Sequence, residues 1–375
     1  MLQAIQTFFV PPKIEKSPYF PQIDGLRALA VLAVFLNHFL NVPPLTKIHW
    51  GHIGVVHFFV ISGLLITLIL LTQRDKSNDE AVSRTTILKN FYIRRFIRIF
   101  PIYYLTIAVL YIAGYPAVVN NLGWLVTYTV NISQGFFAGS FGNTTHFWSL
   151  SVEEQFYIFF PLFILFFRRR HIPYLLIMLI ISSIIYKYVG IVNGLDWKAT
   201  SRFLLGNLDA LGLGALYTYY LVYYEQYKRT FTILLGSCFV VGIPLLVVTQ
   251  MQALSTSLGA VQSDNQYVAI INLAISMTSI VLLHFAVKNS RWLPGYLLRL
   301  APMRYIGKIS YGAYLYHFLL RDIDLYSKTP VEGFLMLSLL SLGLASLSWH
   351  LIEEPINQFK QYFPYLGKKD STPNT

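Results

Sequence analysis

The chain has 375 residues, of which 55% are hydrophobic, 16% aromatic and 12% charged. Soluble globular proteins carry about 25% charged residues, so this composition indicates a polytopic membrane protein. The net charge of +12 does not indicate nucleic-acid binding, because the basic residues lie between apolar blocks and form no continuous stripe. The single cysteine, Cys238, excludes a disulfide framework within the chain and a zinc–thiolate site, and no metal site is predicted.

Ten apolar segments are predicted to span the membrane as α-helices. They cover residues 25–41, 53–72, 99–116, 146–167, 172–190, 203–224, 231–250, 267–287, 308–325 and 331–351. The segment 122–132 is apolar but too short to span at about 1.5 Å per residue, so we expect it to be interfacial or re-entrant. The predicted fold class is therefore an all-α helix bundle that forms one domain over residues 1–375, with an N-terminal segment 1–22 that lacks a signal peptide and a disordered polar tail 365–375.

The distribution of lysine and arginine predicts the orientation in the membrane. If the N-terminus is cytoplasmic, 23 of the 29 basic residues fall in cytoplasmic segments. The other six lie at or near the outer side: Lys47, Lys187, Lys198, Arg202, Arg321 and Lys328. We therefore expect both termini to be cytoplasmic and the protein to be a multi-pass protein of the inner or plasma membrane.

The first predicted helix carries Arg27 and His38 eleven residues apart. Eleven residues at ~100° each return to nearly the same face, ~16 Å further along the axis. With the predicted orientation, Arg27 lies near the inner surface and His38 toward the outer one. Each has a simpler interpretation, Arg27 as a headgroup anchor and His38 as a hydrogen-bonded residue at a helix end. Their shared face favours a functional pair, because polar groups inside a bilayer are costly and usually functional.

A second signal lies at the outer end of the fourth predicted helix. His146, Ser149 and Glu153 share one helix face at spacings of three and four residues. Glu153 lies at a depth comparable with that of His38, so we expect the carboxylate to contact and orient the imidazole. The alternative is a structural ion pair between helices, and Glu154 points elsewhere on the helix.

A third signal is the basic run that enters the third predicted helix from the cytoplasm. Arg95 and Arg98 are three residues apart and can act as one clamp. Guanidinium pairs suit phosphate through bidentate hydrogen bonds, so a phosphate-bearing cytosolic donor is the sharper interpretation. The alternative is contact with anionic lipid headgroups.

Other polar residues are less specific. The pair Ser62-Gly63 permits close helix packing, and we expect His57 to be a core residue. His317 is placed in the membrane, and Glu353 at the inner surface is expected to balance the inner arginines. Three further intramembrane polar residues have no assigned partner: Asn207, Asp209 and His284.

These motifs together resemble the acyltransferase-3 family of integral membrane acyltransferases, over nearly the whole chain. The matching elements are Arg27-x10-His38, Phe58-Phe59-Val60-Ile61-Ser62-Gly63, Arg95-x2-Arg98 with Pro101, Trp148-Ser149-x3-Glu153-Glu154-Gln155-Phe156-Tyr157, Ile309-Ser310-Tyr311 with His317, and Glu353-x-Pro355. The chain departs from many members at Val56, where they carry a carboxylate.

The resemblance implies O-acylation, usually O-acetylation, of a sugar or other hydroxyl-bearing molecule of the cell surface. It implies a cytosolic acyl-CoA, most plausibly acetyl-CoA, as donor substrate, and no permanently bound cofactor. Some members carry a fused extracytoplasmic hydrolase-like domain. None is recognised in this sequence, so we expect the chain to act alone or to pass its acyl group to a separate partner of the envelope-polysaccharide machinery.

The predicted mechanism assigns a role to each motif. Arg95 and Arg98 hold the CoA phosphates, and Arg27 steadies the pantetheine arm or polarises the thioester. His38 acts as general base on the acceptor hydroxyl or carries the acyl group transiently. Glu153 orients His38, and Ser149 donates a supporting hydrogen bond. The remaining supporting residues are His146, His317 and Glu353.

Two alternatives of another class stay open at this stage. A transporter or flippase for a lipid-linked sugar would use the same buried charges as a substrate or proton path. A scaffold in an envelope-polysaccharide complex would need neither His38 nor Glu153 for chemistry. The acceptor and the length of the acyl chain are not determined.

Overall fold

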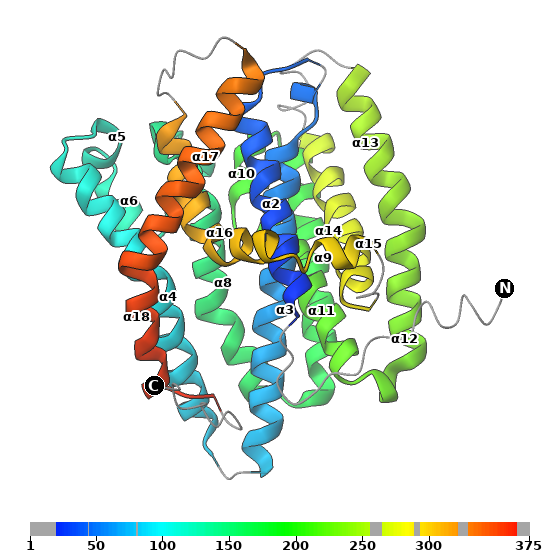
Figure 1. Ribbon diagram of the computed structural model, residues 1–375. Coiled ribbons are helices and arrows are strands. Elements are labelled where there is room, and N and C mark those ends of the chain that lie inside the picture. Colours follow the sequence, from blue (N-terminus) through cyan, green and yellow to red (C-terminus); the bar gives the residue numbers. More distant parts are fainter. Residues whose placement is uncertain are drawn as a thin grey trace.

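The computed structural model describes a bundle of helices, with no strand among the described residues (Figure 1). The described residues are 20–43, 45–79, 82–255, 265–288, 293–321 and 329–365. The long helices are α2 (Pro21–Phe39), α3 (Trp50–Asp79), α4 (Arg84–Ile112), α8 (Phe147–Phe166), α9 (Ile172–Val192), α11 (Leu208–Val222), α12 (Tyr224–Ser237), α13 (Ile243–Ser255), α14 (Asn265–Lys288), α16 (Ala301–Leu320) and α17 (Pro330–Ser348). The shorter ones are α5 (Pro116–Val119), α6 (Leu122–Val126), α7 (Val130–Phe136), α10 (Trp197–Arg202), α15 (Leu293–Leu297) and α18 (Glu354–Gln358).

Each of the ten predicted spans overlaps one of the long helices or, for 231–250, the continuous run of α12 and α13. Within the described residues, seven helical runs are long and apolar enough to cross a membrane. These are Trp50–Ser77, Arg84–Ile112, Gly142–Phe166, Arg169–Val192, Tyr224–Ser255, Ala269–Lys288 and Pro330–Tyr362. The helical membrane bundle is thus confirmed, whereas the full count of ten and the cytoplasmic termini stay predictions.

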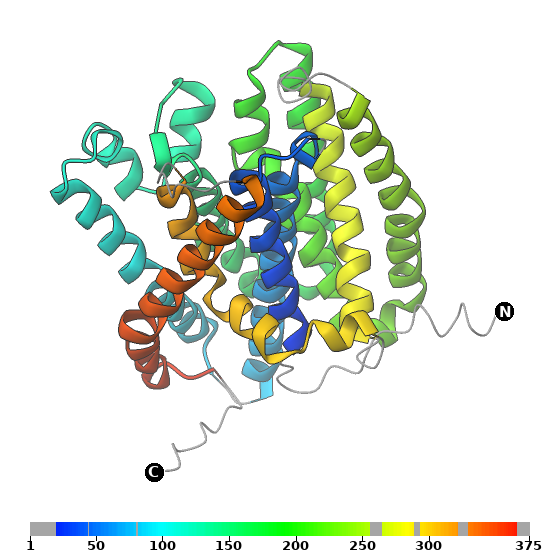
Figure 2. The same cartoon turned by 45° about the horizontal axis from the view of Figure 1, so that its top comes forward.

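The three predicted spans outside this set, α2, α11 and α16, lie inside the bundle. α2 packs against α3, α14, α16 and α17, and α11 packs against α3, α9 and α14 (Figures 1 and 2). Their neighbours shield them from lipid, so these helices tolerate charged and polar residues that a lipid-facing helix would not. α2 and α16 contribute polar residues to the candidate site, together with α3, α4 and α8.

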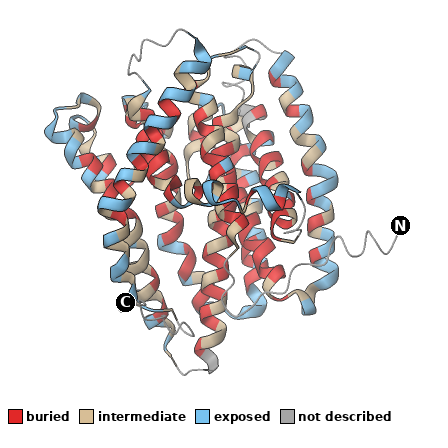
Figure 3. Cartoon of the chain, in the orientation of Figure 1, coloured by how far each residue is buried: buried red, intermediate tan, exposed pale blue. Residues whose placement is uncertain are grey.

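Burial falls from the centre of the bundle to its edge (Figure 3). In the most apolar part of α3, 72% of the residues are buried, compared with 22% in the run of α12 and α13. Between Ile233 and Met251 the exposed side chains of that outer run are apolar except for Ser237, as expected for a surface that faces lipid.

Glycines bring α3 and α11 into close contact. A Cβ atom on Gly63 would lie 2.0 Å from the carbonyl oxygen of Leu211, and one on Gly214 would lie 2.1 Å from the carbonyl oxygen of Val60. Both contacts are with backbone, which has little room to move. The close packing predicted for the Ser62-Gly63 pair is confirmed at Gly63.

The apolar segment 122–132 forms no spanning helix. It contributes α6 and the start of α7, which have five and seven residues. Tyr128 between them has a positive φ of 53°, a backbone conformation that interrupts a helix. In Figure 1, α5 and α6 form a lobe at one edge of the bundle.

Candidate active site

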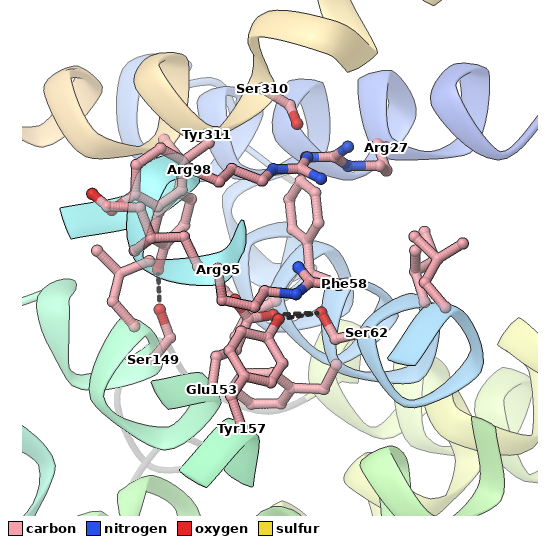
Figure 4. A pocket seen from close by; sticks show the side chains of 17 residues that line it. Arg27, Phe58, Ser62, Arg95, Arg98, Ser149, Glu153, Tyr157, Ser310 and Tyr311 are labelled. Atoms are coloured by element: carbon pink, nitrogen blue, oxygen red, sulfur yellow. Dashed lines mark hydrogen bonds between the residues drawn. The ribbon is translucent and has the colours of Figure 1, made fainter. Parts of the chain in front are cut away.

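Five helices surround a cavity near the centre of the bundle, here called the middle cavity (Figure 4). It collects predicted site residues that are far apart in the sequence: Arg27 from α2, Arg95 and Arg98 from α4, and Ser149 and Glu153 from α8. Its other polar lining residues are Ser62, Tyr157, Ser310, Tyr311 and Tyr314.

A second cavity, the inner cavity, adjoins the middle one, because Arg27 and Arg98 line both. Its lining adds three basic residues, Arg304, Lys308 and Lys360. The acidic residue in this lining is Asp24, whose carboxylate lies 4.0 Å from the guanidinium of Arg27. The inner cavity is thus strongly basic, and it lies on the predicted cytoplasmic side.

A third cavity, the outer cavity, adjoins the middle one on its other side, because Val55 and Tyr314 line both. The remaining polar and aromatic lining residues are Asn37, His38, His49, His52, Thr145, His146, Trp148, Trp197, Ser201, Arg202, Tyr267, Phe318 and Arg321. Three adjoining cavities therefore lead from a basic end past three arginines to a group of histidines.

Glu153 belongs to the middle cavity. Its carboxylate accepts a hydrogen bond of 2.6 Å from Ser62, whose oxygen in turn accepts one of 3.1 Å from Tyr157. It also interacts electrostatically with Arg27 and Arg95, and Figure 4 shows Arg95 extending toward it. Glu154 does not line the cavity.

The predicted contact between Glu153 and His38 is wrong. The two residues line different cavities, and His38 has another partner, because its Nδ1 lies 3.0 Å from Nε2 of His317. The spacing along α2 and α8 indicated a similar depth in the membrane, but it did not indicate which neighbouring helix each side chain faces.

The pairing of His38 with His317 defines the tautomer of both rings. Nδ1 of His317 lies 2.7 Å from the carbonyl oxygen of Tyr314, which only accepts, so this nitrogen carries the proton. Nε2 of a neutral His317 is then an acceptor, and Nδ1 of His38 must donate to it. The unprotonated nitrogen of a neutral His38 is therefore Nε2.

His146 and Ser149 contact α16 and not Glu153. Nε2 of His146 lies 3.1 Å from the carbonyl oxygen of Leu315, and its ring lies 4.9 Å from that of His317. The hydroxyl of Ser149 lies 2.6 Å from that of Tyr314. These contacts hold Tyr314 in the wall between the middle and outer cavities. Ser149 therefore hydrogen-bonds to Tyr314. The sequence predicted that it would instead support the His38–Glu153 pair.

The arginines of α4 have two different environments. Arg94 donates to the carbonyl oxygens of Lys360 and Phe363, at 2.7 and 2.9 Å, and so fixes the end of the described chain. Arg95 stacks on the ring of Tyr157 at 5.0 Å, and Arg98 lines both the middle and the inner cavity. The predicted pair thus differs in its contacts from its neighbour Arg94.

Glu353 lies in a π-helical turn, Trp349–Glu353, at the end of α17. Its carboxylate accepts a hydrogen bond of 3.0 Å from Ser348 and interacts electrostatically with Arg98. The role of Glu353 in balancing the inner arginines stays a prediction.

The other intramembrane polar residues have partners in the core. His57 contacts the hydroxyl of Ser279 at 2.8 Å, which confirms its assignment to the core. Asp209 forms a fully buried ion pair of 2.6 Å with Lys187. Two further residues are held by hydrogen bonds: Asn207 by the carbonyls of Ser201 and Phe203, and His284 by the hydroxyl of Tyr217.

Several lining residues were not singled out from the sequence as site residues. The sequence analysis used Arg304, Lys308 and Lys360 only to predict the orientation in the membrane, because their spacing does not indicate that they line one cavity. Arg202 was likewise counted only as a residue near the outer side. Tyr314 lies between the quoted residues Tyr311 and His317, but its position between two cavities depends on its contacts with His146 and Ser149.

The fold and the cavities define a multi-pass membrane protein whose interior combines arginines, a carboxylate and a histidine pair. The acyltransferase domain family matches residues 20–352, and the chain belongs to this family. The predicted family is thereby confirmed, and the match favours an acyltransferase over the transporter and scaffold alternatives.

Curated relatives cover almost the whole chain. The peptidoglycan O-acetyltransferase OatA of Listeria monocytogenes is 30% identical over 407 residues, which cover 94% of this chain and 58% of that protein. The O-acetyltransferase OatA of Staphylococcus aureus is 28% identical over 388 residues, which cover 96% of this chain and 61% of that protein. The chain thus spans about three fifths of the length of these relatives. No solved structure matches it.

Proposed function

We propose that this chain is a membrane O-acetyltransferase that moves an acetyl group from cytosolic acetyl-CoA to a hydroxyl of a cell-envelope carbohydrate. The observation that carries the proposal is the row of adjoining cavities, with cations at one end and the His38–His317 pair at the other. The names of the relatives support an acetyl group and make peptidoglycan the first acceptor to test.

The donor enters from the inner cavity. CoA carries three phosphate groups, and the side chains of Arg304, Lys308 and Lys360 supply cations for them next to Arg27 and Arg98. The pantetheine arm then extends into the middle cavity past Arg95. An extended CoA covers much of the ~30 Å apolar core, so the thioester reaches the wall formed by Val55 and Tyr314.

The acceptor hydroxyl enters from the outer cavity. Nε2 of His38 takes its proton as the oxygen attacks the thioester carbonyl carbon. The new C–O ester bond forms, the C–S bond breaks, and CoA leaves as the thiolate, which takes the proton from the imidazolium. His317 keeps the correct nitrogen of His38 unprotonated and accepts the hydrogen bond from Nδ1.

Glu153 has a role that differs from the predicted one. It lies among Arg27, Arg95 and Ser62 in the middle cavity, so it balances two cations and limits their movement. The arginines then keep a defined position beside the pantetheine arm, whose amide carbonyls accept hydrogen bonds.

The test uses the purified full chain in lipid nanodiscs with labelled acetyl-CoA and peptidoglycan fragments. We expect ester-linked label on the fragments with the wild type and none above background with His38→Ala, although that variant still inserts and binds CoA. Transfer at the wild-type rate by His38→Ala would remove the proposed base. If the wild type turns over no thioester, the chain is not an acetyltransferase. If labelled His38 accumulates before transfer, His38 is an acyl carrier and not only a base.

A further inference from the structure

The hydroxyl of Ser310 differs from the other hydroxyls that line the middle cavity. Ser310 is fully buried, and its Oγ has no hydrogen-bond partner among the described residues. The other hydroxyls of the lining all take part in hydrogen bonds: those of Ser62, Ser149, Tyr157, Tyr311 and Tyr314. A buried hydroxyl without a partner lowers stability, so its place in the wall of a cavity indicates a ligand contact.

Ser310 lies one helical turn from the wall that separates the middle cavity from the outer one. It precedes Tyr314, which lies in that wall, by four residues of α16, or ~6 Å along the helix axis. α16 packs against α2, and Figure 4 shows the hydroxyl of Ser310 on the side of α16 that faces Arg27. Because Arg304 and Lys308 at the start of α16 line the inner cavity, Ser310 lies on the inner side of the wall.

The neighbouring groups determine which ligand Ser310 suits. The guanidinium groups of Arg27 and Arg98 line the same cavity and only donate hydrogen bonds, so they suit a carbonyl oxygen but not an N–H group. The oxygen of Ser310 accepts hydrogen bonds. This part of the cavity therefore combines donors for a carbonyl with a free acceptor for an N–H, which are the two requirements of an amide.

The pantetheine arm of CoA contains such amides along its length. Two methylene groups separate the sulfur from the nearest amide nitrogen, and they span slightly less than one helical turn. When the thioester lies at the wall formed by Val55 and Tyr314, this amide lies on the inner side of the wall, at the level of Ser310.

We infer that Ser310 is a donor-binding residue, whose Oγ accepts a hydrogen bond from the N–H of the pantetheine amide nearest the sulfur. The contact determines how far the thioester extends toward His38. It makes and breaks no covalent bond. The inference rests on the proposed function and specifies how the same site recognises its donor.

A double-mutant cycle between protein and donor tests this contact. Ser310→Ala removes the acceptor, and an acetyl-CoA analogue with an ester in place of the amide nearest the sulfur removes the N–H. We expect either change to lower kcat/KM about tenfold for the full chain in nanodiscs, with peptidoglycan fragments as acceptor. Both changes together should lower it little further, because either one already breaks the hydrogen bond. Additive losses, or a wild-type kcat/KM for Ser310→Ala with acetyl-CoA, would overturn the inference.

Thermal unfolding separates donor binding from a structural role. Ser310→Ala should unfold at the same temperature as the wild type or a higher one, because it removes an unpaired buried hydroxyl. Ser310→Thr retains a hydroxyl and should recover part of the activity. Ser183→Ala is the matched control and should keep wild-type kinetics. Ser183 is also fully buried without a partner among the described residues, but it lines none of the three cavities. A lower unfolding temperature for Ser310→Ala, with a kinetic loss that Ser183→Ala shares, would overturn the inference.

Equilibrium binding distinguishes failure of this inference from failure of the proposed function. Calorimetry compares CoA with 3′-phospho-ADP, which has the nucleotide but no pantetheine arm. We expect Ser310→Ala to weaken CoA binding about tenfold and to leave 3′-phospho-ADP binding unchanged. This result without acetyl transfer by the wild type would remove the proposed function and retain the donor contact. Acetyl transfer by the wild type, with equal CoA binding by wild type and Ser310→Ala, would retain the function and remove the contact.

Discussion

The imidazole of His38 is oriented by a second imidazole, whose own proton is fixed by a backbone carbonyl. This arrangement resembles a base–orienter pair in which the orienting group is neutral. His317 is buried and lies in contact with α2 through both Phe35 and His38. In the proposed mechanism it acts through His38 and is a positioning residue.

His317→Ala is expected to lower kcat about 10²-fold with little change in KM for acetyl-CoA, because the tautomer and orientation of His38 are no longer fixed. His317→Gln should recover part of the loss, since its amide oxygen accepts from Nδ1 of His38. Steady-state kinetics of purified variants measure both parameters. His171→Gln, at an exposed position, is the control. Equal losses in the Ala and Gln variants, with a raised KM, would instead mean a general structural role.

Arg98 and Arg94 provide a matched pair on one helix. Arg98→Gln should raise KM for acetyl-CoA about 10- to 100-fold, since a hydrogen bond to a charged group contributes about 1.5–3 kcal/mol. Arg94→Gln should leave KM unchanged, because Arg94 contacts backbone at the end of the described chain. Repeating the assay with acetyl-pantetheine, which lacks the nucleotide phosphates, should remove the difference. A persistent difference with that donor would argue against phosphate binding.

At the scale of elements, helix crossings place the site. α2 supplies Arg27 and His38 to opposite ends of the row of cavities, and it keeps this position by packing against α3 and α16. α3 in turn is held by its close crossing with α11 at Gly63 and Gly214. Ser62, the partner of Glu153, precedes Gly63. Neighbouring residues of α3 therefore form the crossing with α11 and part of the wall of the middle cavity.

Gly63→Val is expected to lower stability by ~1–3 kcal/mol, because a side chain at this position meets the backbone of Leu211. Gly343→Val on α17 is the control, since a Cβ atom there meets nothing within 4 Å. Thermal unfolding of both variants in detergent, followed by size-exclusion chromatography, measures the difference. An unchanged midpoint for Gly63→Val would show that α3 and α11 separate more easily than their contact suggests.

At the scale of the whole molecule, charge is divided between two ends. The inner cavity holds cations suited to a nucleotide, whereas the outer cavity holds histidines, tryptophans and two arginines. The predicted orientation assigns these ends to the cytoplasm and the outside, which is where an intracellular donor and an envelope acceptor are found.

Single cysteines test that orientation, because Cys238 is buried and is the sole native cysteine. In a Cys238→Ser background, we expect Asp196→Cys to react with a membrane-impermeant maleimide in intact cells. Glu225→Cys should react only after permeabilisation. Both positions are exposed, so reactivity reports the side of the membrane and not burial. The reverse pattern would invert the predicted orientation.

The sequence by itself determined the class of fold, the approximate position of every long helix and the family, because these depend on local composition, on period and on motifs that each lie within one segment. It also identified most polar residues of the middle cavity, since charged groups within apolar helices are rare. The pairing of those residues was decided by tertiary structure alone. His38 faces His317 because α2 contacts α16, and Glu153 faces Ser62 because α8 contacts α3, and both arrangements depend on side-chain packing over the whole bundle. The basic inner cavity and the histidine-rich outer cavity arise in the same way, from residues that neither spacing nor composition connects.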